Sequence, residues 1–256
     1  MIESFLDAAG SLGWIQISAL WLSLIFAALI RAFTGFGFSL AAMPALSLFM
    51  SPVEAVVLVA MLAVMVGLIT LRKFWGVAPL KPIVPLVLFS LVGTVLGAMA
   101  LESFSPSQFQ LWIGVLVIAA CGILRFFHPK PRDVGLLPRA ATGLTSGLMN
   151  GAFSIPGPPM IVFALATEPD PARSRSLLMV FFLASSLLAL GSYAALGHVT
   201  RQSVNLFLIA APAILVGDVI GHTLFLRFGD KLYRTIALIV LFGAGVTTIL
   251  KALVGG

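Results

Sequence analysis

Long apolar stretches separated by short polar ones recur along nearly the whole chain of 256 residues. Most of them approach the ~20 residues that a helix needs to cross the hydrocarbon core of a bilayer. Segments of about 10 residues with alternating polarity, which build membrane β-barrels, are absent from the sequence. The pattern therefore predicts an all-α polytopic membrane protein. The expected apolar segments are 15–33, 36–50, 53–71, 82–101, 107–127, 139–150, 154–166, 172–196, 203–226 and 232–254.

Two of these stretches contain glycine and proline where a membrane helix would break. The first, residues 31–50, carries Gly35, Gly37 and Pro44. The second, residues 150–159, carries two glycines and three prolines, and a Phe-Ser pair occurs in both stretches. Broken helices in corresponding places of two halves are a frequent sign of a binding site near the middle of the membrane. The two breaks are therefore predicted to form a transport site.

A polar connector, residues 128–138, combines prolines with charge near the middle of the chain. A small-residue motif occurs on both sides of it, as Val-Gly-Thr-Val-Leu-Gly at 92–97 and Val-Gly-Asp-Val-Ile-Gly at 216–221. Glycines four positions apart form a face for close helix packing, within the chain or in a homodimer. We therefore expect two homologous repeats of about four membrane segments, each beginning with a broken or re-entrant helix. The expected parts are an N-terminal segment 1–14, repeat 1 at 15–127, a cytoplasmic connector 128–138 and repeat 2 at 139–256.

The orientation of the repeats depends on whether each break is a single kinked crossing or a re-entrant hairpin. Kinked crossings give an even number of spans in each repeat and parallel repeats, whereas hairpins give an odd number and inverted repeats. Cytoplasmic loops are enriched in Lys and Arg. If the basic regions 72–81 and 125–139 are cytoplasmic, the hairpin arrangement leaves only Arg201 and Lys251 outside. This count favours inverted repeats, and the parallel arrangement stays open.

Composition supports a membrane protein and argues against several other classes. With 60% hydrophobic and 9% charged residues, a soluble fold would lack the polar surface to cover its core. The net charge of +6 comes from short loops and forms no extended patch for nucleic acid. Glu3 and Asp7 precede the first apolar run, unlike the basic start of a signal peptide. No metal-ligand spacing, phosphate-binding loop or catalytic cluster is present, so we expect no enzyme activity, no cofactor and no metal.

The chemistry of the two breaks points to an anion. The start of each half-helix carries partial positive charge and backbone N–H groups without partners. Ser39 and Ser154 are expected to be the first residues of these half-helices, where a hydroxyl can cap the helix or bind an oxyanion. The alternative is that glycine and proline only kink the helices. The expected substrate-binding residues, besides Arg31, are Thr34, Gly35, Phe36, Gly37, Ser39, Asn150, Gly151, Ser154, Pro156 and Gly157.

Three of the ionisable residues in the apolar segments are candidates for function, because a charge inside the membrane is costly and usually functional. Arg31 precedes Gly35 by one helical turn and is the candidate for holding anionic charge; the alternative is that it reaches to a membrane interface. Asp218 and His222 are four residues apart and share a helix face, which suits proton coupling. The alternative for Asp218 is a structural carboxylate. We expect Asp218→Asn to abolish proton coupling and to leave the fold intact.

The break at Gly35-Phe36-Gly37 with Pro44, the second break from Gly147 to Pro159, and the duplicated small-residue motif together resemble the TauE/SafE family of membrane transporters, also called the sulfite exporter or TSUP family. The resemblance covers residues 15–254. It implies a multi-pass transporter of the bacterial inner membrane, often linked to export of sulfite, sulfonates or related organic anions. One departure is the proline-rich second break, because proline supplies no N–H to an anion.

These observations together predict a secondary transporter that exports a small anion, such as sulfite or a sulfonate, by alternating access around a midplane site. One repeat is expected to rock against the other. Proton coupling is a further expectation. The alternative is an anion channel with a fixed constriction at the two breaks. A membrane-embedded enzyme or an assembly subunit is disfavoured because the longest connector is only 128–138. The expected partners are the lipid bilayer and the anion.

Overall fold

The structure, a computed structural model, describes residues 13–254 apart from 35–36, 75–79, 128, 131 and 229. The side chains of 33–34, 72–74, 80–82, 222 and 225–235 also lie outside the description. Gly35 and Phe36 are therefore not placed, and the side chains of Thr34 and His222 are not described.

Ten α-helices and one short 3₁₀ turn at Leu101–Ser103 form the described part of the chain. Each helix corresponds to one of the apolar segments expected from the sequence. Seven of the ten are long and apolar enough to cross a membrane, which confirms an all-α, multi-pass membrane protein. The helices are α2 (Trp14–Thr34), α3 (Phe38–Leu46), α4 (Pro52–Phe74), α5 (Leu80–Ala100), α6 (Pro106–Phe126), α7 (Leu136–Phe153), α8 (Gly157–Thr167), α9 (Pro171–Ala195), α10 (Arg201–Phe228) and α11 (Asp230–Val254).

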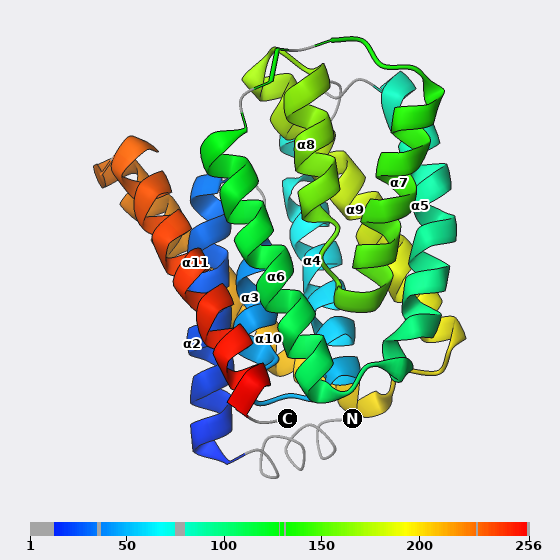
Figure 1. The fold of residues 1–256 in the computed structure, drawn as a ribbon. Helices are drawn as coiled ribbons and strands as arrows, with labels where there is room; N and C mark the ends of the chain where they lie inside the picture. Colours follow the sequence, from blue (N-terminus) through cyan, green and yellow to red (C-terminus); the bar gives the residue numbers. More distant parts are fainter. Residues whose placement is uncertain are drawn as a thin grey trace.

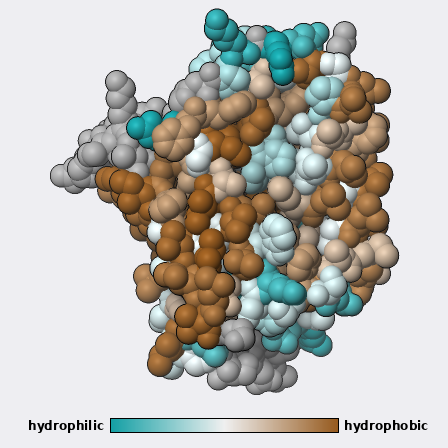
Figure 2. Space-filling view, in the orientation of Figure 1, coloured by the Kyte–Doolittle hydropathy of each residue, from teal (hydrophilic) through white to brown (hydrophobic). Residues whose placement is uncertain are grey.

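Local sequence signals set several helix starts. The Ser105 hydroxyl accepts a hydrogen bond from the Gln108 N–H, and the Gln108 side chain accepts one from the Ser105 N–H, so α6 begins with a capping box and with Pro106 in its first turn. The Asp170 side chain likewise caps α9 by accepting from the Arg173 N–H at 2.8 Å. Hydrophobic side chains cover much of the sides of the bundle, and hydrophilic ones gather at its two ends (Figure 2).

The first break turns the chain back on itself. Near the start of α2, the Trp21 Nε1–H donates to the Ile209 carbonyl of α10 at 3.1 Å. At the start of α10, the Gln202 side chain donates to Glu54 at the start of α4, at 3.2 Å. Because α4 follows α3 directly, α3 ends at the end of the bundle where α2 begins (Figure 1). The helices α2 and α3 therefore form a hairpin and do not join into one kinked crossing.

The second break forms another hairpin, which enters from the opposite end of the bundle (Figure 1). The N–H of Arg132, just before α7, donates to the Ala166 carbonyl in the last turn of α8 at 2.9 Å. The start of α7 and the end of α8 therefore lie together. The two half-helices α3 and α8 reach from these opposite ends toward the interior of the bundle.

Two parallel helix pairs pack unusually closely. A Cβ atom on Gly143, Gly147 or Gly151 of α7 would lie 2.4, 2.3 or 2.1 Å from a backbone oxygen of α5. In the other pair, a Cβ on Gly217 or Gly221 of α10 would lie 2.7 or 2.6 Å from an alanine side chain of α2. Only glycine permits such approach. The glycines of the motif at 216–221 are thus at a helix contact, as the sequence indicated, and each pair joins a helix of one half to a helix of the other.

Candidate functional site

A cavity lies where the two breaks meet. It is lined by Gly37–Leu40 at the start of α3, by Ile155–Gly157 at the start of α8, and by Arg31 at the end of α2. Its volume is about 60 Å³. Since a water molecule needs roughly 10–15 Å³ of such space, the cavity holds a few waters or one small ion. The breaks are far apart in sequence and their residues meet in one site.

Helices α4 and α9 form the remaining walls, and they do so in the same way. Each contributes residues at positions i, i+3, i+4 and i+7, which lie on one helix face. Each set ends with a hydroxyl residue. The lining residues are Ala63, Val66, Gly67 and Thr70 on α4 and Met179, Phe182, Leu183 and Ser186 on α9. Sequence reasoning missed these walls. The two sets are 116 positions apart, one more than the 115 that separates the Phe-Ser pairs of the two breaks, so aligning the halves on their breaks would not have matched them.

At the first break, Gly37 has φ of 92°, a left-handed conformation that favours glycine. It precedes α3, whose first regular backbone bond runs from the Ala41 N–H to the Gly37 carbonyl at 3.1 Å. The N–H groups of the first turn, including that of Ser39, consequently have no acceptor within the helix. Because Ser39 lines the cavity, the positive end of α3 faces the space where an anion would bind.

Neighbouring helices hold the far end of α3 in place. The Gln110 side chain of α6 donates to the Ser47 carbonyl at 2.6 Å, and the Lys251 ammonium of α11 donates to the Leu48 carbonyl. Carbonyl groups at a helix end otherwise lack partners, and a cation there is favourable. These contacts fix the position of a half-helix that is too short to cross the membrane.

At the second break, the expectation that Ser154 begins the half-helix is wrong. Ser154 ends α7 with φ of 54°, and α8 begins three residues later at Gly157. Proline suits the first turn of a helix because the N–H that it lacks has no partner there, and Pro158 and Pro159 occupy that turn. The Ser154 hydroxyl is buried and donates to the Val56 carbonyl at 3.3 Å. It does not line the cavity, so Ser39 and Ser154 are not a matched pair.

Asn150 and Gly151, in the last turn of α7, do not line the cavity. Both bond to α9 and so fix the end of α7. The Asn150 side-chain amide donates to the Ser185 carbonyl of α9 at 2.7 Å. The Tyr193 hydroxyl of α9 lies 3.0 Å from the Asn150 carbonyl and 2.8 Å from the Gly151 carbonyl. The Asn150 carbonyl also accepts from the Ser154 N–H at 2.7 Å, whereas the Gly151 carbonyl lies in the last turn of α7, where partners within the helix run out. Tyr193, which the sequence did not single out, therefore caps the helix end at the break.

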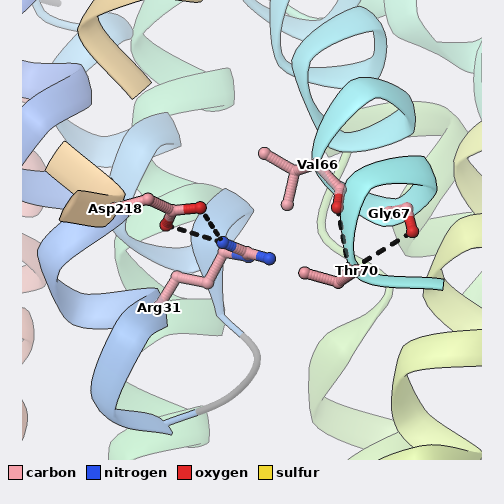
Figure 3. A network of polar contacts seen from close by, with 5 residues as sticks. All are labelled: Arg31, Val66, Gly67, Thr70 and Asp218. Atoms are coloured by element: carbon pink, nitrogen blue, oxygen red, sulfur yellow. Dashed lines mark hydrogen bonds and ion pairs between the residues drawn. The ribbon is translucent and has the colours of Figure 1, made fainter. Parts of the chain in front are cut away.

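Arg31 and Asp218 form an ion pair beside the cavity (Figure 3). Arg31 is only 6% exposed, and its Nη1 donates to both carboxylate oxygens of Asp218 at 2.7 and 2.8 Å. The Asp218 side chain is 28% exposed. The Arg31 guanidinium is thus held inside the bundle by Asp218. The sequence had placed these residues in separate roles, and the structure joins them.

The rest of the Arg31 guanidinium points away from Asp218 toward Thr70 on α4 (Figure 3). The Thr70 hydroxyl lies 2.8 Å from the Val66 carbonyl of its own helix, to which it donates. One side of the guanidinium thus neutralises a carboxylate, while the other faces the cavity wall. Among the described residues, no group of His, Cys, Asp and Glu could hold a metal ion.

The sequence profile of the sulfite exporter TauE/SafE family matches residues 20–248. The chain belongs to this family. It is similar to a probable sulfite/organosulfonate exporter TauE of Cupriavidus necator, with 27% identity over 234 residues, which cover 86% of this chain and 88% of that protein. No solved structure matches the chain. The matched range contains both breaks, the cavity walls and the Arg31–Asp218 pair of this family member.

Proposed function

We propose that this TauE/SafE family member is a secondary transporter that exports a small anion, such as sulfite or a sulfonate, across the bacterial inner membrane. The observation that carries the proposal is the cavity in which Arg31 meets the starts of two half-helices. The name of its Cupriavidus relative supports this substrate class. A cavity of about 60 Å³ suits a compact oxyanion better than a large organic acid.

Three groups would bind the anion. The first-turn N–H groups of α3 supply hydrogen bonds and partial positive charge, the Ser39 hydroxyl donates beside them, and the side of the Arg31 guanidinium that points away from Asp218 supplies a full charge. Helix α8 contributes less, because Pro158 and Pro159 have no N–H. The binding site would therefore be asymmetric, with most of its donors on the side of α2 and α3.

Asp218 would act as a competitor of the anion for Arg31. In the empty protein it neutralises the buried guanidinium, whose unpaired charge would be costly. An incoming anion can take over this role. Asp218, displaced from Arg31 in that state, is the proposed carrier of the coupled proton. His222, one turn further along α10, is the proposed route for that proton.

We also infer that the two halves are inverted repeats. The α2–α3 and α7–α8 hairpins enter from opposite ends, and the parallel pair α2–α10 runs opposite to the parallel pair α5–α7. By the positive-inside rule, the end with the connector and its Arg132 and Arg139 would be cytoplasmic. The opposite end, with Arg201 and Lys251, would face the periplasm.

The close helix pairs change the expected motion. Because α5 contacts α7 and α10 contacts α2 at glycine positions, the two halves of the sequence cannot rock apart as whole bodies without opening both contacts. We propose that the moving units are instead the two pairs, α2–α10 with α3 on one side and α5–α7 with α8 on the other. The cavity lies between them, so their relative tilt would expose it to one membrane face at a time.

The test is sulfite flux into proteoliposomes containing the purified full-length protein. Arg31→Gln should lower the apparent affinity or flux about 10-fold or more, since a hydrogen bond to a charged group contributes about 1.5–3 kcal/mol. Arg175→Gln, at an exposed position at the start of α9, is the matched control and should leave flux unchanged. Equal flux in wild type and Arg31→Gln would contradict the site.

A second measurement separates a transporter from a channel. Saturable sulfite accumulation against its gradient, driven by an imposed proton gradient, is expected of the transporter and excludes a fixed pore. Thermal-shift screening with sulfite, sulfate, sulfonates, carboxylates, cations and neutral solutes tests the substrate class. Stabilisation by cations or neutral solutes in place of anions would overturn the anion proposal.

A further inference from the structure

A second hollow lies on the outer surface of the bundle, between α6 and α11, well away from the central cavity. It is a groove of about 480 Å³. Its walls are mainly apolar, and several are exposed: Phe126 is 79%, Ile239 65% and Phe242 50% exposed. The two helices lie in front in Figure 1, and much of that face of the molecule is hydrophobic in Figure 2. In a bilayer this groove faces lipid.

The floor and one end of the groove have distinct chemistry. The floor is open at Gly122, where a Cβ would meet nothing within 4 Å. Arg125 lies in the last turn of α6, with its guanidinium carbon 5.6 Å from the centre of the Phe126 ring. Because α6 ends one residue later, this cation lies where the helix leaves the apolar layer, at the depth of lipid headgroups.

We propose that the α6–α11 groove binds an anionic phospholipid, with an acyl chain along Gly122 and the phosphate on Arg125. The apolar walls match an acyl chain, and a guanidinium binds phosphate through charge-assisted hydrogen bonds. Basic sites between membrane helices near the cytoplasmic surface select anionic headgroups in this way. The proposal requires only that the protein spans a membrane, and it does not depend on which anion is transported.

A second copy of the chain fits the groove less well. Docking a protein face there would bury Arg125, and among the groove-lining residues that the structure describes no carboxylate is present to pair with it. Burying a cation without a partner is strongly unfavourable. A lipid phosphate instead supplies the missing negative charge and stays at the wet headgroup layer. Charge complementarity therefore favours lipid.

The test uses the full-length protein, purified in detergent and delipidated. Phosphatidylglycerol should raise its melting temperature and remain bound in native mass spectrometry. Phosphatidylcholine with the same acyl chains should have a clearly weaker effect, and inorganic phosphate should have none. Equal stabilisation by the two lipids would overturn the role of Arg125, and stabilisation by inorganic phosphate alone would overturn the role of the acyl chain.

Two variants test the two halves of the site separately. Gly122→Leu places a side chain on the open floor, where a Cβ meets nothing within 4 Å, and should weaken phosphatidylglycerol binding about tenfold, while Gly243→Leu, at an exposed glycine outside the lining, should not. Arg125→Gln should remove the preference for the anionic headgroup, and Arg175→Gln should keep it. Unchanged binding in Gly122→Leu would refute the proposal. So would a change of oligomeric state in that variant, which would assign the groove to a second copy.

Discussion

The Arg31–Asp218 pair predicts an unequal response to the loss of its two members. Asp218→Asn leaves the guanidinium buried, with only 6% of Arg31 exposed, and without a counter-charge. Arg31→Met leaves a carboxylate that is 28% exposed and can be hydrated. Replacing both, as Arg31→Met with Asp218→Leu, removes both charges together. The expectation from sequence that Asp218→Asn leaves the fold unaffected is therefore revised.

The expected magnitudes follow from burial. Breaking a buried ion pair by removing one partner costs about 3–5 kcal/mol, and Asp218→Asn should approach that range. The Asp218 carboxylate left by Arg31→Met keeps access to water, which offsets part of the lost ion pair. Arg31→Met should therefore cost only about 1–2 kcal/mol of stability. The double variant should be within about 1 kcal/mol of wild type, because apolar replacements of buried pairs are often neutral. At about 2–4 °C per kcal/mol, Asp218→Asn should melt clearly below Arg31→Met.

The assay is thermal melting of these proteins in one detergent, together with the single variant Asp218→Leu, so that Arg31→Met, Asp218→Leu and their combination complete a double-mutant cycle. Sulfite binding is measured on the same samples. Asp218→Asn should bind sulfite at least as tightly as wild type, since the competitor for Arg31 has lost its charge. Equal destabilisation by both single variants, with additive effects in the double variant, would refute the pair. Weaker sulfite binding in Asp218→Asn would refute the competition.

Two further predictions concern the helices that position the site. Gly151→Ala should lower stability by about 1–3 kcal/mol, because its Cβ would lie 2.1 Å from the Thr94 carbonyl oxygen. Gly191→Ala, with nothing within 4 Å, is the control; similar melting of both would contradict the close α5–α7 contact. Tyr193→Phe should cost about 1–3 kcal/mol by uncapping the buried Gly151 carbonyl at the end of α7, and unchanged melting would show that this hydroxyl does not cap the helix.

Much of the fold follows from local sequence. The spacing of apolar residues placed all ten helices within a few residues of their observed bounds, because membrane helices satisfy their backbone groups internally and need no partner to form. Caps such as Ser105 and Asp170 act within one turn of the helix that they start. The two breaks were predicted correctly because their cause is also local: glycine and proline change the conformation of the backbone at their own positions.

The direction of the chain after each break was less certain from sequence. Counting basic residues favoured hairpins, and the contacts of Trp21 with Ile209 and of Arg132 with Ala166 place both breaks as hairpins. The start of α8 was predicted wrongly at Ser154. From sequence alone, Ser154 could end α7 or begin α8, because a serine side chain can bond to backbone groups of either helix. In the structure its hydroxyl donates to the buried Val56 carbonyl, and Ser154 ends α7.

The sequence by itself determined that this protein is a helical membrane bundle with two broken segments and a few costly intramembrane charges. Each of these properties depends on composition or on residues within a few turns of one another. Only the tertiary structure decided that Arg31 pairs with Asp218, 187 positions away, that Thr70 and Ser186 face one cavity with the breaks, and that Arg125 stands at the end of a lipid-facing groove. These contacts depend on which helices pack side by side. Helix packing depends in turn on glycine faces such as that of α7, which let segments distant in sequence approach closely.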